Sequence, residues 1–130
     1  MQDFFSRGWL ESFAQRWNAN TEMVEPLAAA GFDAIIALGF ADEKNPSVIL
    51  EIKQGKVEKA GIFSPNSPDA TWDMRATQAG WDKWKQNGLG ISGLGVAVAT
   101  GQLQFRAGDY RRMIRNPQLA MPFLKFFSIL

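Results

Sequence analysis

The chain has 130 residues, a formal net charge of +1 and 46% hydrophobic residues. This length and apolar content are typical of one globular domain, which we expect to span residues 1–130. The near-neutral charge leaves no broad basic face for nucleic acid. The absence of cysteine and histidine excludes disulfides, Cys/His zinc sites and the Ser-His-Asp and Cys-His nucleophile systems. We therefore expect a protein that is not an enzyme and holds no metal or cofactor.

The first segment predicts an amphipathic helix, because large apolar residues recur every four positions: Phe5, Trp9, Phe13 and Trp17. This spacing favours core side chains. Asn20 is placed to cap a second helix over residues 21–32, and Gly31 is placed to stop it. Charges interrupt the N-terminal segment and no run is long enough to span a membrane, so we expect a cytoplasmic protein.

Three strands follow in a meander. Residues 33–41 are apolar on both faces, which predicts a central or covered strand. Residues 48–53 alternate between apolar and polar side chains, a tight turn forms around Gly55, and residues 57–63 return antiparallel. Residues 64–68 form a proline-rich loop.

A second group of elements begins with an alternating strand at residues 69–77. The alternation predicts Trp72 and Met74 to point inward, and Asp73 and Arg75 to point outward. Thr77 is placed to cap a helix over residues 78–87, which ends at Asn87-Gly88. This helix carries two tryptophans on one face and an aspartate that we expect to be exposed: Trp81, Trp84 and Asp82.

The residues from Gly88 to Gly93 spell the G-x-G-x-x-G pattern of dinucleotide-binding turns. That pattern requires a buried strand before it and a full helix opening within it. The preceding residues are instead polar and helical in pattern, so we reject the nucleotide interpretation. Small apolar residues over 88–100 indicate a segment beside a core or cavity, and the alternation of residues 94–99 is typical of a strand.

The C-terminal part predicts a strand at residues 102–108 and a short helix at residues 110–115 capped by Asp109. The helix places arginines on one side: Arg111, Arg112 and Arg115. They form either a solvated face or a contact for lipid headgroups. Asn116-Pro117 begins a very apolar final segment. Its last residues either close a cavity or join the core, contact a second copy, or dock on a bilayer; burial statistics favour the first outcome.

The order of these elements resembles the sterol carrier protein 2-like family over nearly the whole chain. The resemblance lies in four stretches: RWN at the end of the first helix, the meander VILEIKQGKVEKA, the strand and helix PDATWDMRATQAGWDKWKQNG, and GQLQFRAGDYRRM. It implies an α+β fold in which helices cover one face of a five-stranded, mainly antiparallel sheet. It also implies a hydrophobic cavity between the layers, and a short helix begun near Ser92 in place of the strand that alternation indicates.

The resemblance implies non-catalytic binding or transfer of a lipid, fatty acyl chain or sterol-like molecule. We expect the cavity to be lined by Trp81, Trp84, Leu94, Val98, Leu103, Phe105, Met113, Phe123 and Phe127, although the two tryptophans fit plain packing as well. The alternative is an accessory subunit that presents apolar substrates to a partner enzyme or has lost ligand binding. Expected partners are an apolar small molecule or lipid and, transiently, a membrane surface. The chain is expected to be a monomer or weak homodimer.

Overall fold

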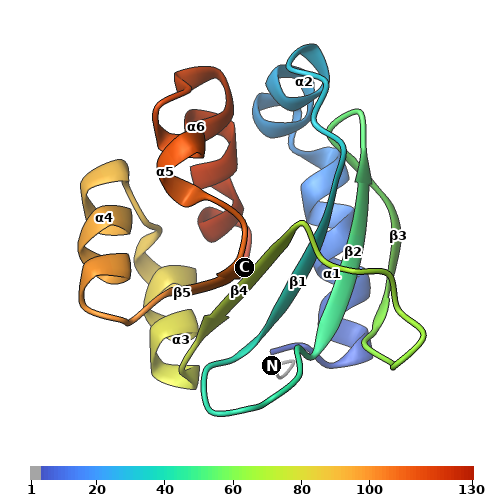
Figure 1. The fold of residues 1–130 in the computed structure, drawn as a ribbon. Helices are drawn as coiled ribbons and strands as arrows, with labels where there is room; N and C mark the ends of the chain where they lie inside the picture. Colours follow the sequence, from blue (N-terminus) through green and yellow to red (C-terminus); the bar gives the residue numbers. More distant parts are fainter. Residues whose placement is uncertain (1–3) are drawn as a thin grey trace.

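The computed structural model describes residues 4–130, so Met1–Asp3 of the segment examined for a targeting signal lie outside it. Figure 1 shows a five-stranded sheet in the order β3-β2-β1-β4-β5. Antiparallel pairing joins β1 (Ala34–Phe40), β2 (Val48–Lys53) and β3 (Lys56–Ile62) into the predicted meander. β4 (Trp72–Ala76) pairs parallel with β1, and β5 (Gln104–Ala107) pairs antiparallel with β4. The sheet is mainly antiparallel, as predicted, with β1 at its centre.

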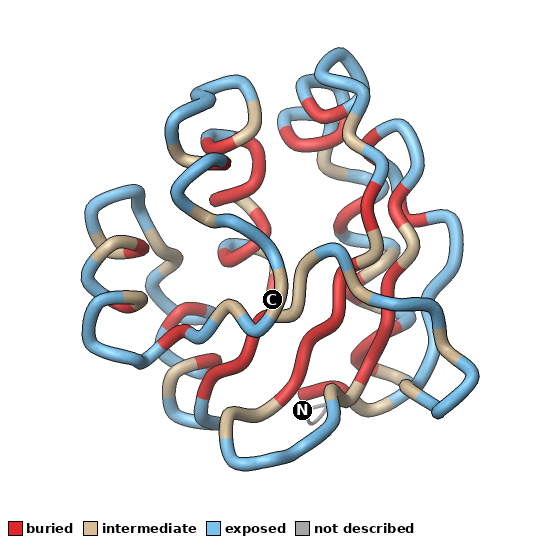
Figure 2. Tube along the Cα trace, in the orientation of Figure 1, coloured by how far each residue is buried: buried red, intermediate tan, exposed pale blue. Residues whose placement is uncertain are grey.

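Helices cover one face of this sheet. They are α1 (Arg7–Ala19), α2 (Thr21–Ala29), α3 (Gln78–Asn87), α4 (Ile91–Ala99), α5 (Tyr110–Ile114) and α6 (Pro117–Leu124), followed by the 3₁₀ helix η1 (Lys125–Ser128). The buried residues gather between the helices and the sheet (Figure 2), which confirms the α+β class. Among residues 4–130, no helix combines the length and apolar character needed to cross a membrane.

The loop at residues 41–47 covers part of the other face of the sheet, and this corrects one prediction. Arg75 was expected to point outward to solvent, yet it is only 1% exposed. Its guanidinium pairs with the Asp73 carboxylate (Nε–Oδ1 2.6 Å) and donates to the Glu43 carbonyl at 2.9 Å. Alternation placed Arg75 on the correct face, but the loop at residues 41–47 folds back over that face and buries it.

Local sequence signals set the ends of most helices. Gly31 terminates α2 with a φ of +68° and donates its N–H to the Ala28 carbonyl at 3.0 Å. Asn20 occupies the N-cap of α2 without a side-chain capping bond. Three other predicted caps accept backbone N–H groups from the first turns of their helices at 3.1–3.2 Å: Thr77, Asp109 and Asn116.

The first aromatic stripe is not entirely helical. Phe5 was expected inside the first helix, but it precedes the Ser6 cap and has a φ of +65°. Its ring packs edge-on against Trp9, Phe40 and Trp81, with centroid distances of 5.1–5.6 Å. The apolar spacing therefore predicted the burial of Phe5 correctly and its backbone conformation incorrectly.

The glycine-rich segment is helical. The residues before Gly88 are helix α3, so no strand feeds the G-x-G-x-x-G pattern, and α4 begins at Ile91. As a helix, the segment buries Leu94 and Ala97 and exposes Val96. The resemblance predicted this helix, whereas the alternation of residues 94–99 predicted a strand wrongly.

Candidate functional site

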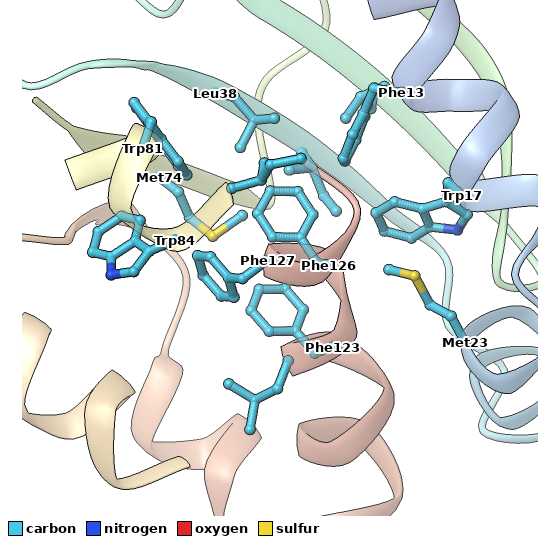
Figure 3. Close-up of a cluster of buried hydrophobic side chains, with 14 of the residues drawn as sticks. Phe13, Trp17, Met23, Leu38, Met74, Trp81, Trp84, Phe123, Phe126 and Phe127 are labelled. Carbon is cyan, nitrogen blue, oxygen red and sulfur yellow. The ribbon is translucent and has the colours of Figure 1, made fainter. Parts of the chain in front are cut away.

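A layer of aromatic rings fills the space between the sheet and the helices that cover it (Figure 3). We call it the aromatic layer; it consists of Phe13, Trp17, Trp81, Trp84, Phe123, Phe126 and Phe127. These rings come from α1, α3, α6 and η1 and are at most 2% exposed. Successive rings touch: the Trp81–Trp84, Trp84–Phe127 and Phe126–Phe127 centroids are 5.4, 5.6 and 4.9 Å apart. The layer therefore behaves as one packed unit.

The C-terminal residues belong to this core. Phe126 and Phe127 are fully buried, and Leu130 is 3% exposed. Arg16 Nε donates to the Ile129 carbonyl at 2.7 Å and its Nη2 to the Leu130 carbonyl at 2.9 Å, and partial burial lowers the pKa of Arg16. Of the outcomes expected for this segment, the structure shows the core, so the tail itself presents no exposed apolar patch.

Four of the nine predicted cavity residues lie in the packed core and border none of the pockets described below: Trp81, Leu94, Phe123 and Phe127, each at most 1% exposed. The indole N–H of Trp81 donates to the Gly39 carbonyl at 3.1 Å, which holds this ring against β1. Leu103 is also buried, at 1% exposed, but it borders a pocket at the protein surface.

A pocket with a mainly apolar lining lies beside α5. Its volume is about 490 Å³, within the range of small-molecule sites. We call it the α5 pocket. Its lining comes from the start of β4, the turn between β5 and α5, and helices α5 and α6 with a residue between them: Thr71, Trp72, Gly108, Asp109, Arg112, Met113, Asn116 and Leu119. Of the nine predicted residues, Met113 lies here.

Gly108 sets the shape of this pocket. It has a φ of +98°, and a Cβ at this position would overlap the Trp72 ring. Only glycine combines this backbone conformation with so close an approach. The Trp72 ring can therefore approach the backbone at Gly108 closely, and it forms a wall of the pocket.

The α5 pocket adjoins the aromatic layer through this wall. The Trp72 ring lies 6.0 Å from Phe123 and 6.0 Å from Phe105, measured between centroids. Phe123 in turn lies 6.3 Å from Phe127. An apolar group in the pocket is therefore separated from the interior by one shell of aromatic side chains.

Two further pockets flank α4. One, of about 440 Å³, brings together three predicted residues, Val98, Leu103 and Phe105, beside Gly101 and Arg111. The other, of about 460 Å³, brings Trp84 against the glycine-rich segment before α4. The small residues of this segment thus border open volume, which agrees with the reason they were singled out.

The charged side chains on and directly after α5 are mainly cationic. Within residues 4–130, the guanidinium groups of Arg111, Arg112 and Arg115 form no salt bridge and no hydrogen bond. Asp109 is engaged as the cap of α5, where its Oδ1 accepts the Arg112 backbone N–H at 3.2 Å. In the same part of the chain, no group of three or more histidine, cysteine, aspartate and glutamate residues is arranged to hold a metal ion.

Sequence reasoning missed much of the α5 pocket. Thr71 was considered as part of the strand predicted at residues 69–77, and Leu119 and Asn116 only as parts of the final segment. Gly108 was noted within a marker stretch, but its contact with Trp72 had no local signal. The sequence offered one clue, namely a glycine directly followed by a helix cap.

No protein-family model matches the chain, and no curated protein matches it. Solved structures do. Sterol carrier protein 2 aligns with 97% of this chain and 95% of its own length, with a TM-score of 0.71 and 16% identity. The chain has an SCP-2-like fold.

Two further SCP-2-like structures agree. A conserved hypothetical protein of Thermus thermophilus, suggested to be a sterol carrier protein, aligns with 98% of this chain and 89% of its own length, with a TM-score of 0.65 and 19% identity. The ubiquinone synthesis protein UbiJ-SCP2 aligns with 94% and 91%, with a TM-score of 0.59 and 12% identity. At identities this low the structural likeness shows the fold alone, and it is the fold that the SCP-2-like sequence markers predicted.

Proposed function

We propose that this SCP-2-like protein is a non-catalytic carrier that binds or transfers an apolar ligand: a lipid, fatty acyl chain or sterol-like molecule. One observation carries the proposal, namely the apolar α5 pocket of about 490 Å³ whose Trp72 wall contacts the aromatic layer. The likeness to sterol carrier protein 2 supports it. Burial of apolar ligand surface supplies about 25 cal/mol per Å².

In this proposal the ligand enters beside α5 and its apolar end reaches the rings behind Trp72. The nine residues predicted to line the cavity then act in two groups. Trp84, Val98, Leu103, Phe105 and Met113 border pockets in the ligand-free protein. Trp81, Leu94, Phe123 and Phe127 are reached when the ligand moves the rings apart. Such an apolar site discriminates weakly between chains, by about 1–3 kcal/mol per methylene.

The test is a titration with fluorescent fatty acid and sterol probes, together with native mass spectrometry of gently purified protein. Leu119 is half-buried in the pocket lining, so Leu119→Trp should fill the pocket and weaken binding at least about tenfold while the protein stays folded. Met121 is 60% exposed on the same helix, so Met121→Trp is the matched control and should bind as the natural chain does. Failure of the natural chain to bind any acyl or sterol probe would overturn the carrier proposal.

A second candidate function is that of an accessory subunit. The ubiquinone synthesis protein UbiJ-SCP2 shares the fold, and α4 exposes two apolar side chains, Ile91 at 49% and Val96 at 61%. The buried C-terminal tail contributes nothing to this surface. Folded protein that binds no probe, yet forms a stable complex with a purified enzyme in light scattering, would favour this role over the carrier role.

A further inference from the structure

We propose that Arg112 makes the α5 pocket selective for amphiphiles with an anionic head group. The guanidinium holds the head at the pocket rim, while the apolar chain lies against Trp72, Met113 and Leu119. The inference rests on the proposed function, in that it assumes a ligand in the α5 pocket. It adds a ligand class and the residue that recognises it.

Arg112 is fixed by its backbone and free at its side chain. Asp109 Oδ1 accepts its backbone N–H at 3.2 Å and so anchors the residue in α5. Its guanidinium has no partner within residues 4–130. Other arginines are committed: Arg75 to Asp73, and Arg106 to the Ala41 carbonyl at 2.6 Å. A guanidinium offers five N–H donors in a planar fork that matches a carboxylate or phosphate.

The other polar groups of the rim also have donors to spare. Asn116 uses its Oδ1 to accept the Gln118 N–H at 3.1 Å, which leaves its amide N–H groups available. Thr71 accepts the Ile35 N–H at 3.2 Å through its hydroxyl oxygen, which leaves the hydroxyl hydrogen available. Donors without acceptors at the mouth of an apolar pocket suit an anion on an apolar chain.

The local charge favours the same ligand. Residues 109–115 carry three arginines and one aspartate, a net formal charge of +2, within a chain whose total is +1. The aspartate lines the pocket as well, and its negative charge opposes an anion. Its carboxylate is engaged as the α5 cap, whereas the arginines around it are unpaired within residues 4–130. The segment that carries Arg112 is therefore net positive, and its field attracts negative charge toward the pocket.

The experiment compares three ligands with one twelve-carbon chain: dodecanoate, monododecyl phosphate and dodecan-1-ol. Affinities are measured by isothermal titration below micelle-forming concentrations, in low salt at about pH 8, where a carboxyl group is ionised. We expect the natural chain to bind at least one anion about tenfold more tightly than the alcohol, because charge-assisted hydrogen bonds are stronger than neutral ones. Preference for either anion supports the proposal and identifies the head group.

Variants then assign the preference to one residue. Arg112→Gln should bring the anion-to-alcohol affinity ratio to about one. Arg112→Lys keeps a positive charge and should retain part of the preference. Arg115, on the same short helical stretch, does not line the α5 pocket, so Arg115→Gln should behave as the natural chain does. Added salt should weaken the preference, because the rim is exposed.

The outcomes separate the two proposals. If the natural chain binds all three ligands equally, or if Arg112→Gln keeps the anion preference, the inference about Arg112 is wrong and the carrier proposal stands. If the natural chain binds none of the three, the inference about Arg112 is wrong, and the carrier proposal fails as well if no sterol probe binds. Arg112 is exposed, so Arg112→Gln should melt with the natural chain, and a thermal scan checks this before titration.

Discussion

The two edges of the sheet, which we call the β2–β3 side and the β5 side, are packed very differently. On the β2–β3 side, Trp17 is fully buried and its indole N–H donates to the Gly55 carbonyl at 2.8 Å. Asn18 bonds both backbone groups of Val57, accepting its N–H at 2.9 Å and donating to its carbonyl at 3.0 Å. A Cβ on Gly55 would lie 2.7 Å from backbone atoms of α2. Helices α1 and α2 are thus locked onto the hairpin.

On the β5 side, side chains alternate between exposed and half-buried, and three pockets lie around α4 and α5. A Cβ on Gly95 or Gly101 would meet no atom within 4 Å. Buried apolar contacts are fewer there, and regions with few such contacts open most readily. One side of the sheet thus supplies a tightly packed frame and the other supplies open volume, an arrangement that suits the proposed carrier function.

We expect the largest loss of stability when a central aromatic ring is removed on the β2–β3 side. Trp17→Ala should destabilise the protein by about 3–5 kcal/mol, because it leaves a cavity among fully buried aromatic side chains. Trp17→Phe, which keeps most of the volume, should cost less. Denaturant unfolding measures both. A loss below about 1 kcal/mol for Trp17→Ala would mean that this side is as adaptable as the other.

Glycine-to-alanine changes compare the two sides directly. Gly55→Ala should cost about 2–4 kcal/mol, because Gly55 has a φ of +78° and backbone atoms stand where the Cβ would lie. Gly95→Ala should instead stabilise by about 0.5–1 kcal/mol, because it replaces glycine inside α4 with open space around the new methyl group. Chemical denaturation of both variants tests the contrast, which fails if the two changes have the same sign.

Filling the pocket beside Val98 probes the volume on the β5 side. Val98 is half-buried, and Val98→Trp should change the free energy of unfolding by less than about 1 kcal/mol while reducing uptake of an acyl probe. In a packed core the same change would cost about 1–3 kcal/mol. A melting curve and a probe titration measure the two quantities. A large loss of stability in ligand-free protein would exclude Val98 from any cavity wall, and unchanged binding would place it away from the ligand.

The smallest expected effect concerns the ion pair between α2 and η1. Lys125 Nζ lies 2.8 Å from Glu22 Oε2; its hydrogen bond, and then its charge, lower the pKa of Glu22. A carboxyl pKa lowered by folding stabilises the folded state above the unfolded pKa, and this stabilisation is lost as the pH falls through the folded pKa. Glu22→Gln should therefore lower the melting temperature slightly at neutral pH and not at all in acid.

High salt should also remove the difference, because both side chains of this pair are exposed. Glu25→Gln is the control, since Glu25 lies on α2 and forms no ion pair within residues 4–130. A difference between Glu22→Gln and the natural chain that persists in acid would contradict the assignment.

The sequence by itself determined the features that depend on neighbouring residues. Helix caps such as Thr77 and Asp109 act through bonds to residues three positions on, and strand alternation sets which side chains share a face. The SCP-2-like markers also predicted the order of the elements and the helical conformation of α4. Near-neighbour pattern predicted a strand there, because small apolar residues fit either state when no packing partner is considered.

Tertiary structure alone decided the features assembled from distant segments. Arg75 is buried because residues 41–47 return over its face of the sheet, which alternation cannot indicate. The aromatic layer is closed where rings of α1 meet rings of η1, more than one hundred positions away. The α5 pocket joins the start of β4 to α5 and α6, around a glycine whose missing Cβ admits the Trp72 ring. Such volumes depend on how side chains from separate elements fill space, and no periodicity along the chain records that.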